Sequence, residues 1–200
     1  MAKEKFLFKR IVAGKFKGKP LKLPSLKTTR SSKAIVLESF FNTVQFDIID
    51  STFVEVFSGS GSIGLEALSR GAKEVLFMEK DRNALRILQE NIDSLDPASC
   101  RVYGGDSFVN IEQIVAKLKK ENTQAYFYID PPFSFREGFE DIYDQTMQLI
   151  IQLPPEVVKL ITIEHMTGLE LPQNLGAYEK KKSKKFGKTS LTYYDKPEME

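Results

Sequence analysis

The sequence predicts an α/β fold built on a mainly parallel, seven-stranded sheet, and three observations indicate it. From residue 52 to residue 165, short apolar runs typical of strands alternate with segments of helical periodicity. A glycine-rich turn follows the first of these strands. The chain then ends in two strand-like runs, 176–187 and 188–196, with no helix between them. Because parallel neighbours need a long crossover, only this closing pair is expected to be antiparallel.

The N-terminal residues, 1–30, are expected to form a small basic β-hairpin extension to a larger domain, 31–200. Two strand-like runs, 6–14 and 17–24, flank a segment in which Gly14 and Gly18 suit the turns. The larger domain opens with a helical pattern over 34–45. Its helices are then predicted at 62–71, 81–95, 107–120 and 137–153, between strands at 52–57, 73–79, 101–104, 125–130 and 159–165.

Charge is distributed unevenly along the 200 residues, whose formal net charge is only +2. Residues 1–33 hold eleven Lys or Arg and one acid, whereas residues 34–177 hold eleven basic and twenty-two acidic residues. A basic arm on an acidic body is typical of a polyanion-binding appendage. Lys180 to Lys185 fit either such a role or a solvated lysine-rich face equally well.

Several classes of protein are excluded by the sequence. No apolar run approaches the roughly 18 residues of a membrane span, and the lysine-rich N-terminus lacks the apolar core of a secretory signal. Cys100 and His165 are each the single residue of their type, so neither a disulfide framework nor a Cys/His metal site is expected. We expect a cytoplasmic, metal-free protein that acts as a monomer.

The glycine-rich turn indicates binding of an adenosine-containing cofactor. A strand ends at Phe57 and is followed by Gly59, Gly61 and Gly64 at GxGxxG spacing, before a helix begins. The next strand ends at Glu79, where a carboxylate can accept hydrogen bonds from ribose hydroxyls. This pattern suits a dinucleotide and S-adenosylmethionine alike, since each contains an adenine ribose.

Two further acids have competing interpretations. Glu55, in the first strand, either meets the α-ammonium of S-adenosylmethionine or forms a structural salt bridge. Asp106 follows the third strand, where it is suited both to contact the adenine amino group and to cap the next helix. The closing antiparallel strands favour a class I methyltransferase over a dehydrogenase, and therefore S-adenosylmethionine as the cofactor.

The run that ends the fourth strand indicates methylation of an exocyclic amine. Asp130 and the backbone carbonyl of Pro131 can hold the two amine protons and direct the nitrogen lone pair toward the methyl group. Pro131 and Pro132 fix the backbone, and Phe133 offers a ring on which a flipped-out base can stack. A simple strand-ending turn is the alternative interpretation of these four residues.

Together these segments resemble the RsmD family, bacterial methyltransferases of N2 of guanine 966 in 16S rRNA. The resemblance rests on RIVAGKFKGKPLKLP, EVFSGSGSIGLEALSRGAKEVLFMEKD, YIDPPF and KKFGKTSLTYYD. It implies a Rossmann-like methyltransferase domain acting on 16S rRNA in an assembled or assembling 30S subunit. The resemblance implies a cofactor site made of Glu55, Phe57, Gly59, Gly61, Gly64, Glu79, Lys80, Asp106 and Ser107. It implies that the catalytic residues are Asp130, Pro131, Pro132 and Phe133. It also implies RNA contacts by Arg10, Lys15, Lys17 and Arg30.

One segment departs from the family pattern, since Lys33-Ala34-Ile35 replaces a Thr-Asp-Arg core. Three alternative functions remain: a DNA adenine-N6 methyltransferase, a non-catalytic RNA-binding assembly factor with a vestigial cofactor fold, and an NAD-dependent oxidoreductase. The short chain leaves little room for the target-recognition insert of a DNA methyltransferase. The intact Asp130-Pro131-Pro132-Phe133 run argues against an inactive protein.

Overall fold

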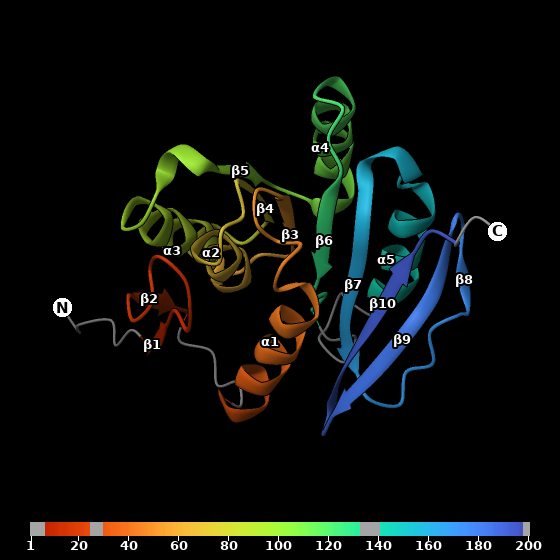
Figure 1. Ribbon diagram of the computed structural model, residues 1–200, viewed down its shortest axis with the longest axis horizontal. Coiled ribbons are helices and arrows are strands. Elements are labelled where there is room, and N and C mark those ends of the chain that lie inside the picture. The colour runs from red at the N-terminus through yellow and green to blue at the C-terminus, as the bar shows by residue number, and fades with distance from the viewer. Residues whose placement is uncertain (1–6, 25–29, 133–140, 198–200) are drawn as a thin grey trace.

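A computed structural model describes residues 7–24, 30–132 and 141–197, with residues 30–33 described as backbone only. The strands of its main sheet are β3 Thr52–Val56, β4 Glu74–Glu79, β5 Cys100–Gly104, β6 Ala125–Ile129, β7 Val158–Met166, β8 Asn174–Leu175, β9 Tyr178–Phe186 and β10 Thr189–Asp195. They lie in the order β5-β4-β3-β6-β7-β10-β9-β8 (Figure 1). β5, β4, β3, β6 and β7 are parallel, whereas β10 is antiparallel to both of its neighbours.

This sheet confirms the predicted α/β fold with its closing antiparallel hairpin. The seven predicted strands are present, and β8 adds a two-residue edge strand paired with β9. Two residues are too few to show a hydrophobic period, which is why the sequence did not indicate β8.

Helices cover both faces of the sheet. They are α1 Arg30–Val44, α2 Ser62–Ser69, α3 Arg82–Asp93, α4 Ser107–Lys120 and α5 Ile142–Gln152, with short 3-10 helices η1 Pro97–Ser99 and η2 Pro155–Val157. α1, α2 and α3 lie on one face, and α4 and α5 lie on the other (Figure 1). Apolar side chains of each set pack together in a core on their own face. Within the described residues α5 begins at Ile142, later than the predicted 137, and residues 137–140 lie outside the described ranges.

The centre of the sheet is fully buried. All five residues of β3 and all five of β6 are buried, as expected for strands covered by helices on both faces. Phe40 of α1 packs edge-on against Tyr128, with ring centroids 4.9 Å apart, and against Phe53 at 6.0 Å. These contacts fix α1 beside the two strands that carry the predicted site.

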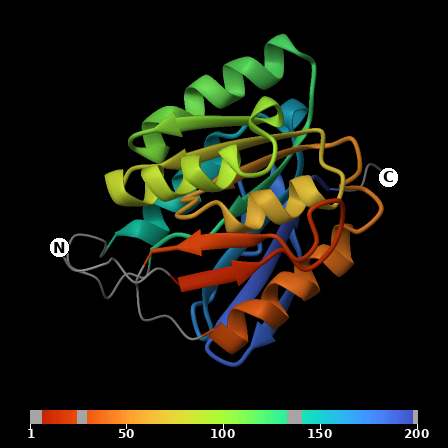
Figure 2. The same cartoon turned by 90° about the vertical axis from the view of Figure 1, so that its left-hand side faces the viewer.

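The N-terminal hairpin forms as predicted, with β1 Leu7–Arg10 antiparallel to β2 Pro20–Leu23. It lies against α2 and α3 (Figure 2), where Ile11 and Leu21 join the hydrophobic core. The buried carboxylate of Glu66 in α2 accepts hydrogen bonds from the backbone N–H groups of Val12 and Ala13, at 2.8 and 3.1 Å. The hairpin is therefore held against the larger domain by backbone contacts as well as by apolar packing.

Within the described ranges, no helix combines the length and the apolar character needed to cross a membrane. The same residues include no group of three or more His, Cys, Asp or Glu side chains placed to hold a metal ion. Cys100 is half-buried, and burial raises the pKa of its thiol to about 12. Its thiol is thus protonated at neutral pH and poorly nucleophilic.

Candidate active site

The predicted site residues meet at the carboxyl edge of the parallel strands. β3 has β4 on one side and β6 on the other, so the strand order reverses between β3 and β6. Such a switch point is the place where open α/β sheets bind their ligands. Val56 and Ile129 are paired across β3 and β6. The glycine-rich turn and the Asp130 segment therefore leave the sheet side by side.

The three glycines of the turn have different structural roles. A Cβ on Gly61 would lie 2.3 Å from Leu88, and one on Gly64 would lie 2.5 Å from Phe77. These two glycines allow α2 to pack closely on α3 and β4. Gly59 adopts a φ of +55°, and a Cβ there would meet nothing within 4 Å. Of the three glycines, Gly59 is therefore the one that borders open space within the described part of the chain.

Glu79, at the end of β4, is held in place by three backbone N–H groups. One carboxylate oxygen accepts a hydrogen bond from Gly59 at 2.6 Å, and the other accepts from Lys80 and Asp81 at 2.8 and 2.7 Å. The carboxylate therefore links the end of β4 directly to the glycine-rich turn. Its orientation is fixed before any ligand is bound, which suits the predicted role in holding a ribose.

Asp106 caps α4, as one of its two interpretations predicted. Its Oδ1 accepts a hydrogen bond from the backbone N–H of Phe108 at 3.0 Å, while Oδ2 forms an ion pair with Lys80 at 3.1 Å. Ser107 is buried in the first turn of the helix. The ring of Phe57 meets that of Phe108 edge-on, with centroids 5.6 Å apart. The adenine contact predicted for Asp106 stays a prediction.

Glu55 lies beneath the glycine-rich turn, with only 4% of its surface exposed. Its carboxylate accepts hydrogen bonds from the backbone N–H groups of Gly64 at 2.8 Å and Ile63 at 3.3 Å. Burial is the main cause that raises the pKa of this carboxyl group to about 8; the charge of Asp130 adds to the rise, whereas the two N–H groups and Lys9 oppose it. Glu55 is thus a carboxyl group that titrates near neutral pH at the inner wall of the site.

Asp130 follows the last residue of β6, where its side chain is half-buried. Pro131 is buried and Pro132 is half-buried, so the two prolines anchor this turn against the domain. The charge of Asp130 raises the pKa of Glu55 and of Tyr128, which shows that the three groups lie within electrostatic range. Phe133 lies outside the described residues.

Three residues at or beside the candidate site were not predicted. Tyr128, two residues before it, donates a hydrogen bond from its buried hydroxyl to Glu164 of β7 at 2.7 Å. Lys9 of the hairpin donates to the hydroxyl of Ser62 at 3.4 Å, at the start of α2. The alternation of side chains along adjacent strands could have placed Tyr128 and Glu164 on the same face of the sheet, since Tyr128 is paired with Thr162. No local pattern places Lys9 there, because its position depends on docking of the hairpin.

The basic residues that were assigned to RNA have separate surroundings. The guanidinium of Arg10 donates to a backbone carbonyl of the hairpin turn at 2.7 Å. Lys15 forms an ion pair with Asp96 at 3.0 Å, and Lys17 is exposed. Arg30 begins α1, and its side chain lies outside the described part. Of the segment that departs from the family pattern, Ala34 and Ile35 lie exposed on the first turns of the same helix.

Comparison with known proteins agrees with this geometry. Residues 9–195 match the family model described as "Conserved hypothetical protein 95". Among curated relatives, "Ribosomal RNA small subunit methyltransferase D" of Haemophilus influenzae is 30% identical over 171 residues, covering 82% of this chain and 83% of its own. "Putative rRNA methyltransferase YlbH" of Bacillus subtilis is 28% identical over 193 residues, covering 94% and 98%.

A solved structure, "Putative methyltransferase yhhF from Escherichia coli", superposes with a TM-score of 0.74 at 26% identity, over 94% of this chain and 98% of its own. This likeness confirms the predicted class I methyltransferase fold. The family match and the relatives likewise confirm the resemblance drawn from the sequence. The chain belongs to the family described as "Conserved hypothetical protein 95", that of the RsmD methyltransferases.

Proposed function

We propose that this chain transfers a methyl group from S-adenosylmethionine to the exocyclic N2 of a guanine in 16S rRNA, of the guanine 966 type. One observation carries the proposal: Asp130 and Pro131 leave β6 directly beside the glycine-rich turn that leaves β3. Relatives named as small-subunit rRNA methyltransferases support rRNA as the substrate.

The residues present fit S-adenosylmethionine. The open space beside Gly59 admits a ligand to the backbone, and the fixed carboxylate of Glu79 is placed to accept hydrogen bonds from ribose hydroxyls. Glu55 brings a carboxyl group that becomes anionic when a cationic amino group is nearby. When bound, this cofactor supplies an electrophilic methyl group on a sulfonium.

Asp130 and Pro131 would orient the base amine. An exocyclic amine is a weak nucleophile because its lone pair is delocalised into the ring. If the Asp130 carboxylate and the Pro131 carbonyl each accept one N–H, the lone pair is turned out of the ring plane toward the methyl donor. The proline rings fix the backbone φ and so the direction of the carbonyl. Asp130 is then placed to receive the proton that the nitrogen loses during or after transfer.

The basic hairpin would hold the RNA. Lys17 is exposed, and the hairpin places Lys9 beside the site through its contact with Ser62. Phosphate contacts of this kind position a nucleic acid without identifying its sequence. We propose that the protein works in the cytoplasm as a monomer, on an assembled or assembling 30S subunit.

The proposal is tested by methyl transfer from labelled S-adenosylmethionine to 30S subunits of a strain that lacks this protein, followed by nucleoside analysis. We expect N2-methylguanosine. Asp130→Ala should lower turnover by roughly 10²–10⁴-fold, with binding of S-adenosylhomocysteine retained. Asp93→Ala is a matched control, because Asp93 is an exposed acid on α3.

Each alternative function gives a different result in this assay. N6-methyladenosine without N2-methylguanosine would point to an adenine methyltransferase. RNA binding without any transfer would favour an assembly factor. Tight NAD binding beside weak S-adenosylhomocysteine binding would indicate an oxidoreductase.

A further inference from the structure

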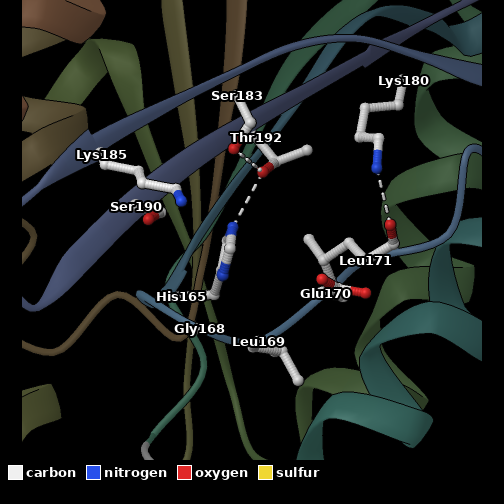
Figure 3. A pocket seen from close by; sticks show the side chains of 10 residues that line it. All are labelled: His165, Gly168, Leu169, Glu170, Leu171, Lys180, Ser183, Lys185, Ser190 and Thr192. Carbon is white, nitrogen blue, oxygen red and sulfur yellow. Dashed lines mark hydrogen bonds between the residues drawn. The ribbon is translucent and has the colours of Figure 1, made fainter.

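A cavity of about 410 Å³ lies on the face of the sheet that carries α5, at the carboxyl end of β7 (Figure 3). β7, β9 and β10 form its floor, and the segment that follows β7 forms one wall. The mechanism above uses none of its side chains. Its lining is mainly polar and includes His165, Lys180, Ser183, Lys185, Ser190 and Thr192.

A chain of hydrogen bonds crosses the floor of this cavity. The two ring nitrogens of His165 lie 3.0 Å from the Met166 carbonyl (Nδ1) and 2.8 Å from the Thr192 hydroxyl (Nε2), and Ser183 lies 2.9 Å from the same hydroxyl. A carbonyl can only accept, so Nδ1 carries a proton. Burial lowers the pKa of His165, so Nε2 of the neutral ring accepts from Thr192. Thr192 then accepts from Ser183, whose oxygen keeps acceptor capacity for a ligand.

Two lysines from β9 give the cavity a positive charge. Lys180 and Lys185 stand on opposite sides of His165 (Figure 3), and Lys180 donates one hydrogen bond to the Leu171 carbonyl at 2.7 Å. An ammonium group has three donors, so this bond uses only part of its capacity. Glu170 is the acidic residue among those that line the cavity, and its side chain is exposed to solvent. The lining therefore suits a ligand that is anionic and also carries a hydroxyl donor.

The cavity lies close to the proposed site of methyl transfer. β7 is the neighbour of β6, and Ile163 is paired with Ile129, the residue before Asp130. His165 is two residues beyond Ile163 along the same strand. With strands about 4.8 Å apart and a rise of about 3.3 Å per residue, the backbone of His165 lies on the order of 8 Å from that of Ile129. A single nucleotide can span such a separation.

We infer that this cavity binds a ribonucleotide adjacent to the methylated base in the RNA strand. Its phosphate would lie between Lys180 and Lys185, and its ribose hydroxyl would donate toward Ser183. Of the β9 lysines, Lys182 instead lies over the ring of Tyr193, with its Nζ 4.8 Å from the ring centroid. The inference rests on the proposed function, because it takes the substrate to be RNA.

The test measures steady-state methylation of a short rRNA fragment by Lys180→Glu and Lys185→Glu. We expect KM for RNA to rise at least about tenfold for each variant, with kcat within about twofold, since a phosphate contact acts on binding. Lys73→Glu is the matched control, because Lys73 is exposed just before β4, at the opposite edge of the sheet. S-adenosylhomocysteine affinity should not change in any of the three variants, and the melting temperature should not change for Lys185→Glu or Lys73→Glu, whereas Lys180→Glu also loses the hydrogen bond to the Leu171 carbonyl.

A second arm identifies the ligand. RNA fragments carrying one neutral methylphosphonate, or one 2′-deoxy sugar, are scanned along the sequence near the target. A methylphosphonate at one position should weaken RNA binding to the unaltered protein but not to Lys185→Glu. A 2′-deoxy sugar at one position should likewise weaken RNA binding to the unaltered protein but not to Ser183→Ala. If the unaltered protein is active and Lys185→Glu has the same KM for RNA as Lys73→Glu, the inference is refuted. Binding of inorganic phosphate to the cavity without any contribution to RNA binding would also refute it. Absence of methylation by the unaltered protein would instead refute the proposed function.

Discussion

Glu55 should release a proton when the cofactor binds. Its buried carboxyl group has a pKa of about 8 in the free protein, so it is mostly protonated at pH 7. S-adenosylmethionine carries an α-ammonium and a sulfonium, and a positive charge close to a carboxyl group favours its ionised form. The two N–H groups from Ile63 and Gly64 already point at the carboxylate and would stabilise the ionised state.

The size of the effect follows from the pKa. If binding returns the carboxyl group to its ordinary pKa, about 0.9 proton is released per cofactor at pH 7, and the apparent affinity rises nearly tenfold from pH 6 to pH 7 before levelling off above pH 8. The same pKa also affects stability. The pKa of Glu55 is about 8 in the folded protein and 4.5 ordinarily. The contribution of Glu55 to the free energy of unfolding is therefore complete below pH 4.5 and is lost as the pH rises through 8.

Isothermal titration calorimetry at pH 7, in buffers with different ionisation enthalpies, counts the protons released. S-adenosylhomocysteine retains the ammonium and should release the same proton, whereas adenosine lacks it and should release none. Glu55→Gln keeps the shape of the side chain and serves as the control. An equal proton count for Glu55→Gln and the unaltered protein would refute this reasoning.

Two further predictions concern the glycine-rich turn and the hairpin. Gly64→Ala should destabilise the protein by about 1–3 kcal/mol, because its Cβ would lie 2.5 Å from Phe77; denaturant unfolding measures this, and an unchanged midpoint would show that α2 can shift. Changing Lys15 and Lys17 to Glu should weaken RNA binding and flatten its dependence on salt by about one unit of slope per lost phosphate contact. Filter binding across salt concentrations measures that slope, and an unaltered slope would leave both lysines as solubilising residues.

The sequence by itself determined the fold class and indicated where the candidate site lies. Hydrophobic periodicity is a local property, so the alternation of strands and helices could be predicted without knowledge of long-range contacts. The glycine-rich turn, Glu79 and Asp130 could be located because each lies at or just after the carboxyl end of a strand, and parallel strands end at one edge of their sheet. The N-terminal and closing hairpins were equally evident from their strand patterns and turns.

Only the tertiary structure decided what the individual side chains contact. It separated Gly59, which borders open space, from Gly61 and Gly64, which allow close packing. It also placed Glu55 beneath the turn, and it directed Lys180 and Lys185 of β9 into one cavity. These contacts depend on segments that are far apart in the chain and meet through packing. A sequence pattern reports only the local spacing of residues along the chain, so it could not predict them.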